Sequence, residues 1–216
     1  MNFKTIIFLV SIYTISFYSS GQTKDWNFYD FDSIVSVEMP FDVYEVDTII
    51  NYNKVYQIFS NDSIQKFIIQ RSFISKTYSN IETLKPPNDK NSLKVFYREI
   101  AWTINDLIDY ELDRYFPIEK DNLMGYRFIF KNEDIDIQEI QLFLVNKNLY
   151  SFNYFSLNGL KENERDLFFN SILFNKDISL EQYPKKPILS LKNIIILLLI
   201  VLLISFMTKS KNKLKT

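Results

Sequence analysis

Apolar side chains recur at two spacings along the central part of this chain. Alternating or continuous apolar runs that are rich in Val, Ile, Phe and Tyr are typical of strands. They predict strands at residues 34–39, 43–50, 54–59, 65–73, 125–130, 137–145 and 149–157. A loop with two adjacent prolines, residues 85–91, follows the fourth strand. We expect the strands before this loop to form an antiparallel meander.

Apolar residues spaced by three and four predict two helices. In the first, residues 92–113, the apolar side chains from Leu93 to Ile108 fall on one face, and Ser92 is placed to cap the N-terminus. The second helix is predicted at residues 161–173. Its predicted inward-facing residues are Leu167, Phe168, Ser171 and Ile172.

A short hairpin connection is predicted at Asn146-Lys147-Asn148, because Asn tolerates a left-handed backbone. In the strand after it, aromatic residues alternate onto one face. Such a row can bind sugars, but beside an apolar neighbouring strand it is more simply one buried face. The residues of this predicted face are Tyr150, Phe152 and Tyr154, with Ile140, Leu142 and Leu144 of the preceding strand.

The first 21 residues have the layout of a secretory signal peptide. Lys4 supplies a positive charge, residues 6–18 are apolar, and Ser19-Ser20-Gly21 offers small residues for cleavage before Gln22. An uncleaved N-terminal anchor is the alternative. In both cases we expect the following chain to lie outside the cytoplasm.

Near the C-terminus, residues 188–208 are apolar enough to predict a transmembrane helix. At about 1.5 Å per residue they would cover about 31 Å, the thickness of a hydrocarbon layer. A basic tail, residues 209–216, follows, and lysines just beyond a span mark the cytoplasmic side. We therefore predict a single-pass protein of the inner cell membrane with its C-terminus in the cytoplasm. The flanking lysines are Lys185, Lys186, Lys192, Lys209, Lys211, Lys213 and Lys215.

The formal net charge of −1 conceals an acidic outer domain, predicted at residues 22–184. Without the eight lysines of the terminal segments, 17 basic residues stand against 26 acidic ones, a net charge of −9. Such a surface repels phosphate backbones, so we expect no nucleic-acid partner. The predicted partners are a lipid bilayer and an envelope protein.

Several residue types on which catalysis and cofactor binding depend are absent. With His 0 and Cys 0, the chain cannot form a Ser-His-Asp triad, a Cys nucleophile or a His- or Cys-ligated zinc site. With Gly 3, it cannot assemble the glycine-rich phosphate loops of nucleotide-binding proteins. We therefore expect a protein that is not an enzyme, and we predict no catalytic, cofactor-binding or metal-binding residue and no cofactor.

The helix predicted at residues 92–113 carries two features away from its apolar face. Trp102 and Val95, seven residues apart, form a possible partner-binding patch, unless another segment covers them. An acidic stripe is typical of a solvated face, and a catalytic carboxylate site is the alternative. The stripe consists of Glu99, Asp106, Asp109 and Asp113.

Three stretches, in this order along the chain, resemble the PsbP-like α/β/α fold group, which includes envelope proteins of Bacteroidetes. They are VEMPFD (Val37–Asp42), LFLVNKNLYSFNYFS (Leu142–Ser156) and LFFNSILF (Leu167–Phe174), and the resemblance covers residues 34–174. The glycine that usually follows the strand-ending proline is Phe41 here. The resemblance implies a curved antiparallel sheet packed with helices, in a binding or assembly module.

Together these observations predict the α+β class. We expect a curved antiparallel sheet of about six or seven strands packed with two helices, plus a C-terminal transmembrane helix. The predicted function is that of a membrane-anchored extracytoplasmic module with a non-catalytic binding or assembly role. Two alternatives remain open: a small subunit of a membrane complex that acts through its span, and a carboxylate-dependent hydrolase.

Overall fold

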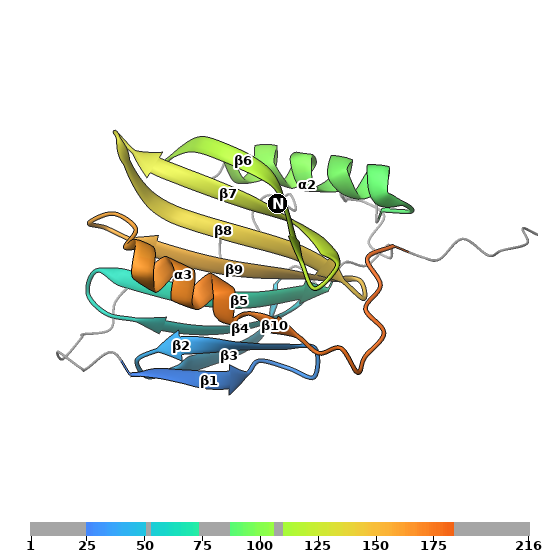
Figure 1. Cartoon of the computed structure of the whole chain (residues 1–216), viewed down its shortest axis with the longest axis horizontal. Coiled ribbons are helices and arrows are strands. Elements are labelled where there is room, and N and C mark those ends of the chain that lie inside the picture. The colour runs from blue at the N-terminus through green and yellow to red at the C-terminus, as the bar shows by residue number, and fades with distance from the viewer. Residues whose placement is uncertain (1–24, 51–52, 74–86, 106–109, 184–216) are drawn as a thin grey trace, which may run out of the picture. The chain divides into compact units, whose positions relative to one another are not determined.

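A computed structural model describes residues 25–50, 53–73, 87–105 and 110–183 (Figure 1). The chain divides into two compact units, Met1–Tyr183 and Pro184–Thr216, and all described residues belong to the first. The predicted signal peptide at 1–21 and the predicted span and tail at 188–216 lie outside the described residues.

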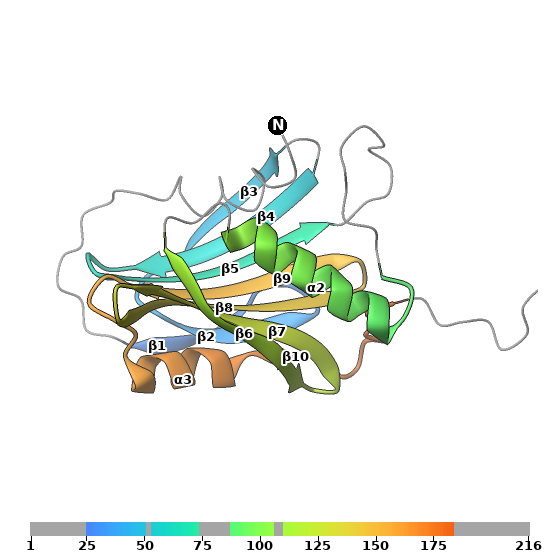
Figure 2. The ribbon, with the colours of Figure 1, turned by 90° about the horizontal axis from the view of Figure 1, so that it is seen from above.

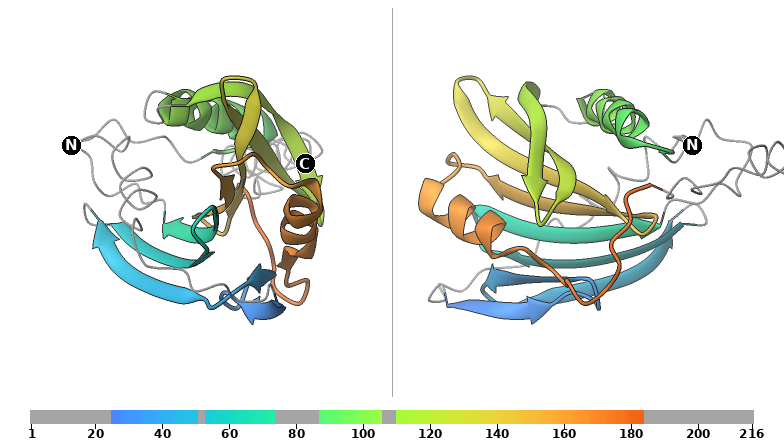
Figure 3. Two further views of the ribbon diagram at one scale, coloured as in Figure 1. Left: turned by 90° about the vertical axis from the view of Figure 1, so that its left-hand side faces the viewer. Right: turned by 45° about the vertical axis from the view of Figure 1, so that its right-hand side comes forward.

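Seven antiparallel strands form the main sheet. In spatial order they are β3 (Tyr44–Ile50), β4 (Asn53–Asn61), β5 (Gln65–Phe73), β9 (Asn148–Ser156), β8 (Ile135–Val145), β7 (Leu123–Asn132) and β6 (Glu111–Lys120). The left view of Figure 3 looks along the strands and shows that this sheet is curved.

A second, three-stranded sheet packs on one face of the main sheet together with helix α3 (Glu162–Ser171). Its strands are β1 (Trp26–Asp30), β2 (Val35–Pro40) and β10 (Leu173–Phe174), in the spatial order β1-β2-β10. Helix α2 (Lys90–Asn105) packs on the opposite face, so Figure 2 shows the two helices on different sides of the sheet. The main sheet therefore separates two apolar cores.

The predicted fold class is wrong as stated, although the structure is α+β. The described residues form ten strands in two sheets, rather than one sheet of six or seven strands. Strands β1, β6 and β10 were not predicted, because β10 has two residues and β1 and β6 are too exposed to alternate clearly. Neither helix in the described part of the chain is long and apolar enough to cross a membrane, and residues 188–208, where the transmembrane helix was predicted, lie outside that part.

Helix α2 begins earlier and ends earlier than its apolar spacing predicts. Asp89, not Ser92, caps it: the Ser92 N–H donates to Asp89 Oδ1 at 2.9 Å, and Asp89 N–H donates back to Ser92 Oγ at 2.9 Å. The helix ends at Asn105, and by Glu111 the chain has entered β6. The inward face is nevertheless the predicted one, and its buried residues are Leu93, Phe96, Tyr97, Ile100, Ala101 and Ile104.

The two apolar rows of the β8–β9 hairpin are buried on opposite faces, which corrects the prediction of one shared face. Phe152 lies opposite Gln141, whereas Leu142 lies opposite Ser151. Because partners across a ladder share a face, the aromatic row of β9 joins the core under α3, and the row from Ile140 to Leu144 joins the core under α2. A one-residue difference in register separates the two arrangements.

The turns after β8 and β2 and the buried face of α3 test three further predictions. Asn146 and Lys147 have positive φ values of 50° and 64°, which confirms the left-handed hairpin connection. Phe41 has φ 63°, so the turn after β2 adopts a conformation that favours glycine while carrying a phenylalanine. In α3, Phe168 is buried as predicted, but Leu167 is exposed, and Phe169 takes the second inward position.

Candidate functional site

The predicted partner patch lies on the outward side of α2. The Trp102 side chain is 63% exposed and that of Val95 is 40% exposed, and no other described segment covers them. Tyr97 fixes the opposite side of the same helix to the sheet: its hydroxyl donates to the Met124 carbonyl at 3.1 Å and accepts the Leu144 N–H at 2.7 Å. The exposed tryptophan therefore projects from a helix that is held in place.

The predicted acidic stripe is not assembled on one helix. Glu99 lies on α2, but Asp113 lies on β6, and Asp106 and Asp109 are outside the described residues. The carboxylate of Asp113 is 3.2 Å from Lys131 Nζ and 2.6 Å from Arg114 Nε. The hydrogen bond from Lys131 and the adjacent Arg114 hold the pKa of Asp113 below its usual value. This carboxylate is suited to ion pairing rather than to accepting a proton.

The seven lysines predicted to flank a membrane span all lie outside the described residues, in the range 185–215. The structure therefore describes none of their contacts. Within the part of the chain that it does describe, no group of three or more acidic side chains is arranged to hold a metal ion.

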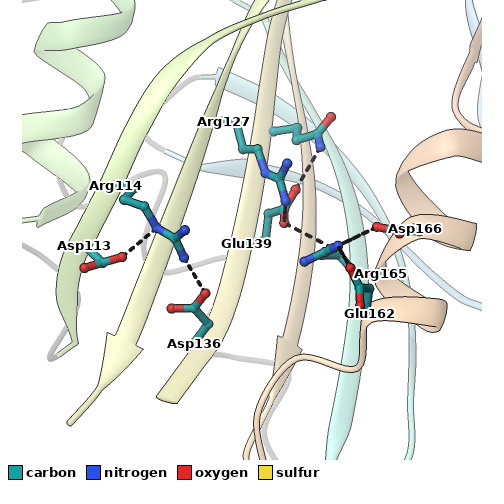
Figure 4. Close-up of polar contacts among 9 residues, drawn as sticks. Asp113, Arg114, Arg127, Asp136, Glu139, Glu162, Arg165 and Asp166 are labelled. Carbon is teal, nitrogen blue, oxygen red and sulfur yellow. Dashed lines mark hydrogen bonds and ion pairs between the residues drawn. The ribbon is translucent and has the colours of Figure 1, made fainter. Parts of the chain in front are cut away.

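A cluster of charged side chains lies between the main sheet and α3 (Figure 4). Its centre is Glu139 of β8, whose side chain is 0% exposed. Arg127 Nη2, from the adjacent strand β7, donates to Glu139 Oε2 at 2.5 Å, and Gln141 Nε2 donates to Glu139 Oε1 at 2.9 Å. Arg165 of α3 approaches the same carboxylate to 4.0 Å. One carboxylate thus joins two strands and a helix.

Burial raises the pKa of Glu139 above that of an exposed glutamate, and the contacts with Gln141, Arg127 and Arg165 offset this only in part. Arg127 is also partly removed from water. Its Nε is buried without a hydrogen-bond partner, and its guanidinium lies 5.6 Å from the centre of the Phe116 ring. A buried ion pair of this kind contributes little net stability. Arg165, 4.0 Å from the same carboxylate, ties α3 to this pair, because moving α3 away would take a cation from a buried negative charge.

The N-terminal half of α3 is held by further polar contacts. The Tyr154 hydroxyl accepts hydrogen bonds from Gln65 Nε2 at 2.8 Å and from the Lys161 N–H at 3.3 Å, and Gln65 Nε2 also donates to Glu164. Burial raises the pKa of Tyr154 to about 12, so this phenol stays neutral at physiological pH. These groups connect β5, β9 and α3.

A second, partly buried ion pair links the turn before β2 to the main sheet. Asp32 Oδ2 lies 2.6 Å from Arg71 Nη1 and accepts the Tyr150 hydroxyl at 2.9 Å. The other carboxylate oxygen accepts the N–H groups of Ile34 and Val35, both at 2.8 Å, and so closes the turn. Both oxygens of this carboxylate accept hydrogen bonds from other parts of the fold, which indicates a structural role.

Sequence reasoning identified Trp102 and Val95 but missed the Glu139 cluster. The available signal was a charged residue, Glu139, next to the apolar Ile140 and within a strand that carries a long apolar run, beside a strand that carries Arg127. A carboxylate in such a place needs a cation on the neighbouring strand. No family model matches this chain, and no curated protein matches it.

Proposed function

We propose that this protein is a non-catalytic binding module of the cell envelope, and that the outward side of α2 contacts its partner. The observation that carries the proposal is the exposure of Trp102, 63%, with the exposed Val95 about two turns away on the same side of the helix. A large indole group in water is unusual away from an interface, and tryptophan is among the residues that contribute most to binding when they become buried.

The attachment of α2 supports this proposal. Tyr97 makes two hydrogen bonds, one buried and one partly buried, to backbone groups of β7 and β8, and it stacks on Tyr126 with ring centres 5.1 Å apart. A side chain presented by a helix held in this way loses little conformational freedom on binding, because the backbone that carries it is already ordered.

The setting of the module at the envelope is proposed from the two ends of the chain. Residues 1–21 have the layout of an export signal, and residues 188–208 are apolar and flanked by lysines, which favours attachment to a lipid bilayer. The acidic outer domain favours a protein partner over a nucleic acid. The PsbP-like resemblance of residues 34–174 points to the same class of binding or assembly modules.

Photo-crosslinking tests the proposal directly. A photo-reactive residue that replaces Trp102 in the full-length chain should give a discrete adduct in the cells that produce the protein. Leu157 is a matched control, because it is similarly exposed at 59% but follows β9, in a different part of the fold. The proposal is contradicted if position 102 gives no adduct, or gives the same adducts as position 157.

A further inference from the structure

Strand β3 forms one edge of the main sheet and is open on its outer side within the described residues. It pairs with β4 without interruption from Tyr44 to Ile50, and no other described strand pairs with it. Such an edge directs alternate N–H and C=O groups outward, where another strand can bind them. The opposite edge, β6, contains Pro117 and a register shift that hinder an added strand, whereas β3 contains neither.

The exposed side chains of β3 alternate between apolar and acidic from Tyr44 to Asp47, and Ile49, 72% exposed, follows on the face of the two acids. Tyr44 and Val46, 51% and 37% exposed, lie on one face of the edge, and Glu45 and Asp47 lie on the other. Both acids have only surface contacts, Glu45 with the Tyr56 hydroxyl at 3.1 Å and Asp47 with an exposed lysine at 3.4 Å. Exposed contacts of this kind contribute little and are readily exchanged.

A second copy of this chain is a poor occupant of this edge. When two β3 strands pair in antiparallel orientation, each side chain lies opposite a side chain on the same face of the sheet. A register centred on Val46 would place Glu45 opposite Asp47, and registers centred on either acid would place that acid opposite itself. Like charges directly across a ladder are destabilising, so self-association through the middle of β3 is disfavoured.

We infer that β3 accepts an extended segment of another protein in which basic and apolar residues alternate. The basic side chains would lie opposite Glu45 and Asp47, and the apolar ones opposite Tyr44 and Val46. Backbone hydrogen bonds supply affinity in such strand addition, and the alternation supplies specificity. The net charge of −9 on the outer domain also attracts a basic segment. This site is separate from the Trp102 patch, so either proposal can fail without the other.

The probe is a short synthetic peptide of alternating valine and lysine, and its counterpart of alternating valine and glutamate is the control. The full-length chain should bind the lysine peptide at least about tenfold more tightly than the glutamate peptide. Amide hydrogen exchange should slow at residues 44–49 when the lysine peptide is bound. The double variant Glu45→Lys/Asp47→Lys should reverse the preference between the two peptides.

A charge-matched variant separates this site from general attraction to an acidic surface. Asp30→Lys/Asp177→Lys changes the net charge equally but alters exposed positions outside β3, and it should keep the preference for the lysine peptide. The inference is overturned if protection falls outside β3, if both peptides bind equally, or if the two double variants behave alike. The crosslinking result at position 102 does not bear on any of these outcomes, so the two proposals are tested separately.

Discussion

Removing the hydroxyl of Tyr97 should destabilise the protein by loosening α2 from the sheet. This hydroxyl is fully buried and makes two hydrogen bonds, to the Met124 carbonyl and from the Leu144 N–H. In Tyr97→Phe the Met124 carbonyl still accepts Gln182 Nε2 at 2.7 Å, so only the N–H of Leu144 loses the acceptor that Tyr97 provides. A buried donor without a partner costs about 1–3 kcal/mol, and we expect a loss of about 2 kcal/mol.

The control for this prediction is the neighbouring tyrosine. Tyr126 stacks on Tyr97 and is nearly as buried, but the structure gives its hydroxyl no hydrogen bond, so Tyr126→Phe should change the free energy of unfolding by less than about 0.5 kcal/mol. Equilibrium urea unfolding of the full-length chain measures both, with an unchanged slope expected for each. The reasoning is refuted if the two substitutions have equal effects, or if Tyr97→Phe is as stable as the wild type.

Further substitutions test other parts of the structure. A Cβ at Gly125 would lie 2.5 Å from the Phe143 ring and 2.6 Å from the Leu142 carbonyl oxygen, so Gly125→Ala should lower stability by about 1–3 kcal/mol in the same urea assay, and an unchanged midpoint would contradict the packing. Burial raises the pKa of Glu139 in the folded protein. The protonated carboxyl group therefore contributes its full share to folding stability below about pH 4, and this share is lost as the pH rises through the pKa of the folded state. The stability of the wild type relative to Glu139→Gln should therefore fall over that window; a difference independent of pH would count against it. Trp102→Ser should leave the unfolding free energy within about 0.5 kcal/mol of the wild type, because its side chain contributes to no core, whereas a large loss would place it in a packed contact.

Strong periodicity predicted the elements that face a core. The strands β2, β4 and β5, the β8–β9 hairpin and the inward face of α2 follow directly from apolar spacing, because burial selects these residues. Strand β6 has no such constraint on most of its length, and its acidic start at Glu111 reads equally well as the end of a helix. Strand β6 is specified by backbone pairing with β7, which sequence periodicity does not record.

The position of the aromatic row illustrates a second limit. Both rows of the β8–β9 hairpin were predicted to be buried and both are, but the faces were assigned wrongly. A central strand buried on both sides has no polar face to define its register, so Phe152 can be assigned to either core from composition alone. Only the pairing of Phe152 with Gln141 decides this.

The same limit applies to the candidate sites. Trp102 was identified because it departs from a clear helical pattern, and the structure leaves it exposed. The contacts of Glu139 involve β7, β8 and α3, which are distant in sequence and meet only in the folded chain. The open edge at β3 likewise depends on which strand is last in the sheet.

Cysteine labelling in intact cells tests the central claim, a folded binding domain outside the cytoplasm, most directly. The natural chain has no cysteine, so each introduced thiol reports alone. Lys176, 79% exposed, is the reporter, and Ala101, buried in the α2 core, is the control for folding. We predict that a membrane-impermeant maleimide labels Lys176→Cys in intact cells and labels Ala101→Cys only after denaturation. Labelling of Lys176→Cys only after lysis, or of Ala101→Cys without denaturation, would contradict the account.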